Sequence, residues 1–513
     1  ADAIESSALI VLCTDYDSDG VTANWVARRA LVNFFNVEQE RVVSVIGERR
    51  AGYGITDAVC DEIESLPGKV ALVISADQGS SDEPRIKRLK AHGIPVCITD
   101  HHQLGPEGPP LSAAAVVNPQ RADCGYEKTI AGVAVLFLMM CLVRQELIRR
   151  GTLSNDAPKL TPLLKNVALG TIADCVGLDT AVNRALVRAG LQLINRFDDP
   201  AWQAMRALLG TERAPFDAEL LSFQVASRIN AASRVANAYT ALNFLLSEDC
   251  DSARVHLARL DQDNKERRRI EAEMLDLAMA AALPKAVPGK CSLVVAIDGH
   301  PGVQGIVASR IAERFGVPSC VLTRIDDSIF SGSLRAGLDE VDIHTVLETI
   351  DALYPGMLKS YGGHRAAGGL RLTTDGLQSF EDAFEQAVRT QIGPAEPAPL
   401  LLTDGKLDED SLTLRTVETL DTLQPYGRGW PAPQYDNVFR IKSIRYVGET
   451  GEHAQLVLET LDERRLRGIF FRGRDTLTEM TPGTIARFVY TPTANRYRGG
   501  VTLQLLVRHV EAV

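Results

Sequence analysis

The segment ALIVLCTDYDSDG, residues 8–20, joins an apolar run to three carboxylates and a glycine. The run has the length and composition of a buried strand. Three carboxylates within five residues repel one another unless cations neutralise them. If the segment stays extended, its alternate residues face the same way and converge before Gly20 turns the chain into a helix. These carboxylates are Asp15, Asp17 and Asp19.

Apolar strands alternate with helical stretches over the first 180 or so residues. Such alternation indicates a parallel sheet covered on both faces, whose ligands bind beyond the carboxyl ends of the strands. The expected strands are Ala8–Thr14, Val42–Gly47, Val70–Ala76 and Pro95–Thr99. The expected helices lie near Thr22–Phe34, Thr56–Ser65 and Glu83–His92.

The rest of the chain divides into four further regions. A largely helical part, 162–246, precedes a long polar helix from about Ser252 to Ala282. A second strand and helix region, 291–391, ends at the Pro-rich linker Gly393–Leu400. Short alternating strands then continue to Val513, which predicts a small barrel or sandwich.

Composition limits the class of protein. The 513 residues include 55 Lys and Arg against 66 Asp and Glu, a net charge of −11, so the chain is no bulk polycation that coats nucleic acid. Nine scattered cysteines without a CxxC pair are typical of buried thiols in a reducing cytosol. The longest apolar stretch, Ile130–Val143, is too short to span a bilayer and predicts a core helix. We expect a cytoplasmic protein without signal peptide or membrane contact.

Further acidic and histidine side chains follow other predicted elements of the first domain. They are Asp77, the tripeptide Asp100–His101–His102, and Asp174 in LGTIADCVGL. Two adjacent histidines point to different sides, which favours one metal ligand and one substrate contact. Carboxylates with imidazole suit Mn²⁺ or a similar divalent ion. Two such ions, about 3.5–4 Å apart, cleave phosphoesters by in-line displacement.

The motifs DxDxDG, strand-end Asp, DHH and GTxAD, in this order, resemble the DHH phosphoesterase superfamily. Within it the chain resembles the RecJ family of exonucleases, which act on single-stranded DNA from the 5′ end. Matching segments extend over nearly the whole chain: GYG (52–54), SRINAASR (227–234), DGHPGVQGIVASR (298–310), SGSLRA (331–336) and GGHRAAGG (362–369). The segment GRGWPAPQ (427–434) departs from the family, where a GNPEP-like stretch is common.

The resemblance implies a domain order and an α/β fold class. We expect a parallel-sheet DHH domain with a helical part at 1–250 and a connecting helix at 251–285. A smaller α/β DHHA1 domain at 286–393 and an OB-fold β-barrel at 394–513 would follow.

The resemblance also implies roles for the motif residues. Two Mn²⁺ ions, with Mg²⁺ as a possible substitute, would be held by Asp17, Asp19, Asp77, His101 and Asp174, and Asp77 would bridge them. His102 would contact the scissile phosphate, while Asp15 and Asp100 would be minor ligands or would orient the other ligands and balance charge. A pocket for the 5′-terminal phosphate would use Arg49, Ser333 and Arg335. The remaining substrate contacts would come from Arg228, Asn230, Arg234, His300 and His364.

Basic and aromatic residues interleave in the C-terminal region, a pattern that suits single-stranded nucleic acid. The candidates for this surface are Arg467, Phe470, Arg472, Arg496 and Tyr497. Ordinary strands with buried Phe and exposed Arg would give the same pattern.

The function expected from the resemblance is a metal-dependent 5′→3′ exonuclease that converts single-stranded DNA to 5′-mononucleotides in repair and recombination. A phosphodiesterase for short oligonucleotides or cyclic dinucleotides is one alternative, and a non-catalytic relative that acts as a scaffold is another. The resemblance further implies a helicase and single-strand-binding protein as partners.

Overall fold

The computed structural model describes residues 1–105, 107–210, 215–393, 401–448, 450–496 and 500–513. Three sheets follow one another along the chain: a parallel sheet, a mixed sheet and a closed barrel. This confirms the predicted fold class, while the exact domain boundaries stay predictions. The proposed linker falls mainly on residues 394–400, outside the described ranges. No helix in those ranges is both long and apolar enough to cross a membrane.

The first sheet has the order β2-β1-β3-β4-β5, and every neighbouring pair is parallel. Its strands are β1 (Leu9–Thr14), β2 (Val42–Ile46), β3 (Val70–Ala76), β4 (Val96–Thr99) and β5 (Ala115–Val117). Alternate residues of β1 enter two cores. Ile10 and Leu12 face the helical side, and Val11 and Cys13 face α3 (Asp57–Glu64) and α4 (Glu83–Ala91). The aspartate-bearing loops therefore share the carboxyl edge of the sheet.

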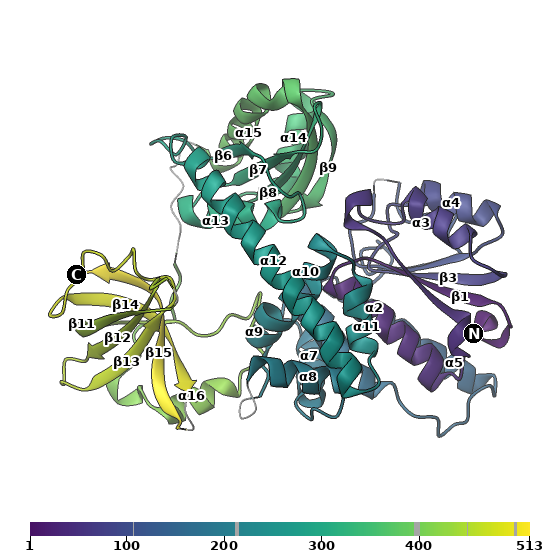
Figure 1. The fold of residues 1–513 in the computed structure, drawn as a ribbon, viewed down its shortest axis with the longest axis horizontal. Helices are drawn as coiled ribbons and strands as arrows, with labels where there is room; N and C mark the ends of the chain where they lie inside the picture. Colours follow the sequence, from purple (N-terminus) through teal and green to yellow (C-terminus); the bar gives the residue numbers. More distant parts are fainter. Residues whose placement is uncertain (106, 211–214, 394–400, 449, 497–499) are drawn as a thin grey trace.

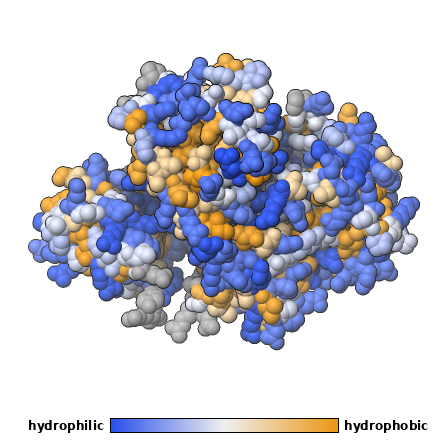
Figure 2. Space-filling view, turned by 45° about the horizontal axis from the view of Figure 1, so that its top comes forward, coloured by the Kyte–Doolittle hydropathy of each residue, from blue (hydrophilic) through white to orange (hydrophobic). Residues whose placement is uncertain are grey.

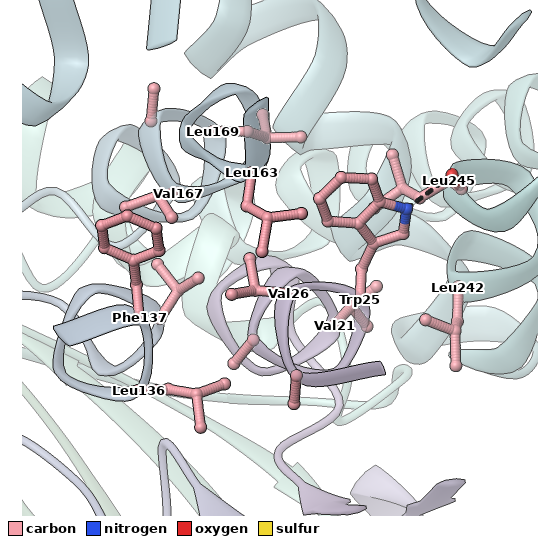
Figure 3. Close-up of a cluster of buried hydrophobic side chains, with 14 of the residues drawn as sticks. Val21, Trp25, Val26, Leu136, Phe137, Leu163, Val167, Leu169, Leu242 and Leu245 are labelled. Carbon is pink, nitrogen blue, oxygen red and sulfur yellow. Dashed lines mark hydrogen bonds between the residues drawn. The ribbon is translucent and has the colours of Figure 1, made fainter. Parts of the chain in front are cut away.

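Helix α2 (Ser18–Arg29) lies at the centre of the larger core. Figure 3 shows its Val21, Trp25 and Val26 among side chains of three other helices. The indole Nε1 of Trp25 donates a 2.8 Å hydrogen bond to the Leu245 carbonyl. The surrounding helices are α5 (Gly132–Arg149), α6 (Leu164–Ala173) and α11 (Tyr239–Leu246). This packing fixes the start of α2, where the first carboxylates lie.

The 33-residue helix α12 (Cys250–Ala282) connects the first domain to the second. At 1.5 Å per residue it is about 50 Å long. Its first half packs on α8 (Pro200–Leu209), α10 (Ser227–Val235) and α11, and its second half on α13 (Gln304–Phe315) and β6 (Leu293–Ile297). Figure 1 shows it crossing diagonally between the two domains.

The second sheet has the order β6-β7-β8-β10-β9, in which only β6 and β7 are parallel. The other strands are β7 (Ser319–Arg324), β8 (Ile329–Arg335), β9 (Leu358–His364) and β10 (Ala367–Thr373). Helices α14 (Ile343–Leu353) and α15 (Leu377–Ile392) contribute apolar side chains to its core.

The C-terminal barrel closes in the order β11-β12-β13-β15-β14. Its strands are β11 (Tyr435–Val447), β12 (His453–Glu459), β13 (Arg465–Phe470), β14 (Ile485–Asn495) and β15 (Thr502–Ala512). Five strands closed in this order are the pattern of an OB-fold. On the face drawn in Figure 2 the barrel lobe is mainly hydrophilic, and larger hydrophobic areas lie on the second domain.

Candidate metal centre

The first aspartate motif folds differently from the expected extended segment. Helix α2 begins at Ser18, so Asp19 already lies in its first turn. The reason is the side chain of Asp17, whose Oδ1 accepts hydrogen bonds from the N–H groups of Asp19 (2.9 Å) and Gly20 (3.2 Å). Gly20 allows the start of α2 to pack against the Asp15 backbone, because a Cβ at position 20 would lie 2.2 Å from the Asp15 carbonyl oxygen.

Asp19 is buried against the start of helix α5. Its Oδ2 accepts from the Gly132 N–H at 2.7 Å and its Oδ1 from the Val133 N–H at 2.9 Å. Burial, followed by the charge of Asp17, raises the pKa of Asp19 to about 7. The N-terminus of α5 stabilises the Asp19 carboxylate and so partly offsets the free-energy cost of burying its charge.

Asp77, His101 and Asp174 come together from three separate segments. His101 Nε2 lies 3.2 Å from Asp77 Oδ1 and 3.7 Å from Asp174 Oδ2. Asp77 follows β3 with a left-handed backbone (φ +60°), and Asp174 directly follows α6. The ligand atoms of three overlapping sets lie within 4.8 Å of one another: Asp15, Asp17 and Asp77; Asp19, His101 and Asp174; and Asp77 with Asp100, His101 and His102.

Several atoms of this cluster are buried without a hydrogen-bond partner among the described residues. They are Asp15 Oδ1, Asp77 Oδ1 and His101 Nε2. Burial and neighbouring carboxylates raise the pKa of Asp15 and of Asp77 well above the usual range. Burial, and then the charge of His102, lowers the pKa of His101 to about 4, which leaves the neutral imidazole that binds metals. This donor set fits a pair of Mn²⁺ or Mg²⁺ ions.

Asp100 orients the two histidines that follow it. Its Oδ1 accepts from both of their backbone N–H groups and lies 2.8 Å from His102 Nδ1, while its Oδ2 accepts from the Ser80 N–H. Burial opposes the charge of Asp100, but the hydrogen bonds from His102 and Ser80 outweigh it and hold the pKa of Asp100 below its usual range. Asp100 is therefore a positioning residue.

His102 is held on three sides. Burial acts to lower its pKa, but the hydrogen bond and charge of Asp100 raise that pKa to about 9. The Tyr53 hydroxyl lies 2.8 Å from His102 Nδ1 and also donates to the Asp77 carbonyl at 2.9 Å. The ring of His364 stacks on His102 with centroids 5.8 Å apart. Near neutral pH, His102 is thus a fixed cation beside the metal cluster.

The GYG motif alone assigns no role to Tyr53, although its hydroxyl contacts both His102 and the Asp77 carbonyl. Sequence patterns also missed Gly132 and Val133, whose N–H groups hold Asp19. The signal for Gly132 is a glycine within the apolar stretch Ile130–Val143, and in the structure a Cβ there would lie 2.7 Å from Asp77 Cβ.

A cluster of arginines adjoins the metal centre. Arg49 lies 4.2 Å above the Tyr16 ring, and its buried Nε has no hydrogen-bond partner among the described residues. Burial, and then the charges of Arg49 and Arg267, lowers the pKa of Arg234 to about 10, with a smaller effect of Arg335. Like charges packed this closely suit a polyanionic ligand.

Ser333 and Arg335 lie on β8 beside the first turn of α13. A Cβ on Gly305 would lie 2.8 Å from Arg335 Nη2 and 3.5 Å from Ser333 Oγ, so the missing side chain leaves space there. His300 shapes the preceding turn, since its Nδ1 accepts from the Gly302 N–H. Arg234 reaches across from the first domain and donates to the Gly302 carbonyl at 2.7 Å.

Arg228 and Asn230 are engaged within the protein. Arg228 is 8% exposed, pairs with Asp261 of α12 at 3.0 Å and donates to the Gln224 carbonyl. Asn230 Oδ1 accepts from the Ser18 N–H at 2.8 Å and from the Ser18 hydroxyl at 3.0 Å. These contacts hold α10 against the connecting helix and against the first aspartate loop. Their role at the substrate stays a prediction.

The candidate nucleic-acid-binding residues of the barrel differ in exposure, because alternate residues of strand β13 face solvent and the barrel core. Arg467 faces solvent, whereas Phe470 is 8% exposed and belongs to the barrel core, so a stacking role for Phe470 is wrong. The exposed ring is Phe471, 58% accessible and edge-on to His453. Arg472 and Arg496 are exposed, and Tyr497 lies outside the described residues.

Comparisons with known proteins agree with this arrangement. Three family models match: "DHH family, N-terminal domain" at residues 9–171, "DHHA1 domain" at 289–390, and "RecJ OB domain" at 403–509. The chain is 32% identical to the single-stranded-DNA-specific exonuclease RecJ of Haemophilus influenzae, over 100% of this chain and 89% of that protein. The chain belongs to the RecJ family.

Other RecJ proteins extend the comparison. RecJ of Escherichia coli is 30% identical over 99% of this chain and 88% of its own length. The crystal structure of Thermus thermophilus RecJ in complex with Mn²⁺ matches this chain with a TM-score of 0.78 and 26% sequence identity. The match covers 100% of this chain and 70% of the Thermus thermophilus chain. The same protein with Mg²⁺ gives a TM-score of 0.73. Both ions agree with the donor set described above.

Proposed function

We propose that this chain is a metal-dependent 5′→3′ exonuclease that hydrolyses single-stranded DNA to 5′-mononucleotides. The observation that supports this most directly is a carboxylate and histidine cluster with partnerless buried atoms next to a cluster of arginines. The relatives named above are single-stranded-DNA-specific exonucleases. Repair and recombination, and a helicase and single-strand-binding protein as partners, rest on the family resemblance, while a cytoplasmic location rests on the scattered, unpaired cysteines.

The metal ligands divide into two groups. Asp15, Asp17 and Asp77 would surround one divalent ion, and Asp19, His101 and Asp174 the other, with Asp77 beside both. Two ions bound there would neutralise the phosphodiester, activate a water near neutral pH and stabilise the leaving oxygen.

His102 and the arginine pocket would position the strand. Since Asp100 keeps His102 protonated, its imidazolium can donate to the scissile phosphate. Arg49, Ser333 and Arg335 offer charge-assisted hydrogen bonds to a terminal phosphate at the N-terminus of α13. A 5′ phosphate held there would place the first internucleotide bond at the metal centre and set the polarity.

The test is digestion of internally and end-labelled single-stranded DNA, with and without a 5′ phosphate, in Mn²⁺, Mg²⁺ or chelator. We expect 5′-mononucleotides released from the 5′ end, about tenfold faster cleavage with the 5′ phosphate, and no product in chelator. The variant Arg335→Ala should remove the preference for the phosphate, and Arg371→Ala, on neighbouring β10, is the control. Cleavage of a cyclic dinucleotide but not of a long strand would contradict the proposal, as would complete inactivity with both ions.

A further inference from the structure

The segment Leu423–Trp430, which precedes the barrel, is anchored on the first domain. Arg184 of α7 (Ala181–Ile194) donates to the Pro425 carbonyl at 3.1 Å and to the Leu423 carbonyl at 2.7 Å. The same guanidinium lies 4.7 Å above the Trp430 ring. In Figure 1 the yellow-green chain leaves the barrel and reaches the helical part of the first domain.

A backbone hydrogen bond also joins this segment to the chain that follows Asp174. The Leu178 N–H, four residues after Asp174, donates to the Arg428 carbonyl at 2.7 Å. The residues on either side of Arg428 are glycines that permit close approach. A Cβ on Gly427 would lie 2.8 Å from Leu178 Cδ1, and one on Gly429 (φ +72°) would lie 2.6 Å from Asp179 Oδ1. The backbone of Arg428 is therefore fixed beside the chain that leads from Asp174.

The side chain of Arg428, in contrast, is exposed and has no hydrogen-bond or ion-pair partner among the described residues. Its charge still reaches the site. Burial, and then nearby positive charges that include Arg428, lowers the pKa of His364. A fixed backbone thus presents a free cation at the Asp174 end of the metal cluster.

The position of Arg428 differs from that of the other arginines. Arg49 lies 4.2 Å above the ring of Tyr16, which stands between Asp15 and Asp17, so the terminal-phosphate pocket adjoins the first aspartate motif. The Arg428 backbone is bonded to Leu178, four residues after Asp174, and belongs to the segment that continues into the barrel. A strand whose 5′ phosphate lies at Arg49 and Arg335 would pass the metal ions and leave toward the barrel.

We propose that Arg428 binds the phosphate on the 3′ side of the scissile bond. This inference rests on the proposed exonuclease function. It assigns a substrate contact to GRGWPAPQ, the segment in which this chain departs from the common family pattern. Arg428 would hold the remaining strand in register for the next cleavage.

The experiment compares two 5′-phosphorylated substrates, dithymidylate and trithymidylate. Both offer a terminal and a scissile phosphate, but only the trinucleotide has a phosphate on the 3′ side. Arg428→Ala should lower kcat/KM about tenfold on the trinucleotide and leave the dinucleotide unchanged, and Arg428→Lys should retain part of the effect. Arg415→Ala, an exposed arginine of α16 (Leu414–Asp421), is the matched control.

A trinucleotide with a neutral methylphosphonate at its second linkage provides an independent test. The unaltered protein should cleave this substrate about tenfold more slowly than the natural trinucleotide. The Arg428→Ala variant should cleave the two trinucleotides at equal rates. If Arg428→Ala lowers kcat/KM equally on the dinucleotide and the trinucleotide, or lowers it on neither, the proposed role of Arg428 is overturned. If the unaltered protein cleaves no single-stranded DNA at all, the proposed function fails instead.

Discussion

His101 and His102 are neighbours in the chain but differ in protonation. The pKa of His101 is lowered to about 4 and that of His102 is raised to about 9, so near pH 7 one is neutral and the other charged. Burial opposes the charge of both, and only His102 has Asp100 at 2.8 Å to compensate. The neutral ring suits a metal and the charged ring suits a phosphate.

Replacing each histidine with alanine should separate these roles. His101→Ala should weaken Mn²⁺ binding by about 100-fold, whereas His102→Ala should keep Mn²⁺ binding and lower kcat by about 100-fold. Titration calorimetry with Mn²⁺ and single-strand digestion give the two readouts. His92→Ala, an exposed histidine at the C-terminal end of α4, is the control. Equal loss of Mn²⁺ binding in both variants would contradict this division.

Helix α10 connects three parts of the protein through three of its side chains. Asn230 bonds to Ser18 beside the first aspartates, Arg228 pairs with Asp261 of the connecting helix, and Arg234 bonds to Gly302 of the DHHA1 domain. The geometry of the metal loop is therefore coupled to the element that places the second domain.

Asn230→Ala should weaken Mn²⁺ binding without unfolding the protein. The Ser18 N–H and hydroxyl would lose their acceptor, so the loop that holds Asp17 and Asp19 would lose orientation. We expect roughly 10-fold weaker Mn²⁺ affinity, the usual effect of removing a group that orients metal ligands. Asn243→Ala, an exposed asparagine of α11, is the control. Unchanged Mn²⁺ affinity would show that Asn230 does not position this loop.

Arg228→Ala should act mainly on stability. Its loss would leave Asp261, whose side chain is 14% exposed, without its arginine partner. Removing one partner of a buried pair costs about 3 kcal/mol, and Lys265 at 3.0 Å from Asp261 would offset part of it. Thermal unfolding should begin at lower temperature while KM for single-stranded DNA stays the same below that transition. A raised KM with unchanged unfolding would instead support a direct contact with DNA.

In the whole molecule, the carboxylates of the metal centre oppose folding when no ions are bound. Burial and neighbouring charge raise the pKa of Asp19 to about 7 and those of Asp15, Asp77 and Asp174 well above the usual range. Because these folded-state pKa values exceed the unfolded ones, the ion-free protein should lose stability as pH rises toward and through them.

Mn²⁺ should therefore stabilise the protein more at pH 8 than at pH 5.5. Saturating ions at about 100 times the dissociation constant would add about 2.7 kcal/mol, and protons compete for the same carboxylates at lower pH. Thermal unfolding with Mn²⁺ or chelator at both pH values measures the effect. An Asp77→Asn variant should strongly reduce the stabilisation by Mn²⁺. A Mn²⁺ shift that is equal at both pH values would contradict this linkage.

Strand periodicity, a local property of the chain, was sufficient for the fold class, whereas the order of the domains and the roles of the metal-centre residues came from the resemblance of the motifs to the RecJ family. Sequence patterns were insufficient for Asp19, which lies in a helix that Asp17 caps, and for Phe470, whose burial depends on which face of β13 closes the barrel. They also gave no hint that Arg428, 250 positions after Leu178, accepts a hydrogen bond from the Leu178 N–H. Such proximity arises from packing between distant segments, which no local pattern encodes.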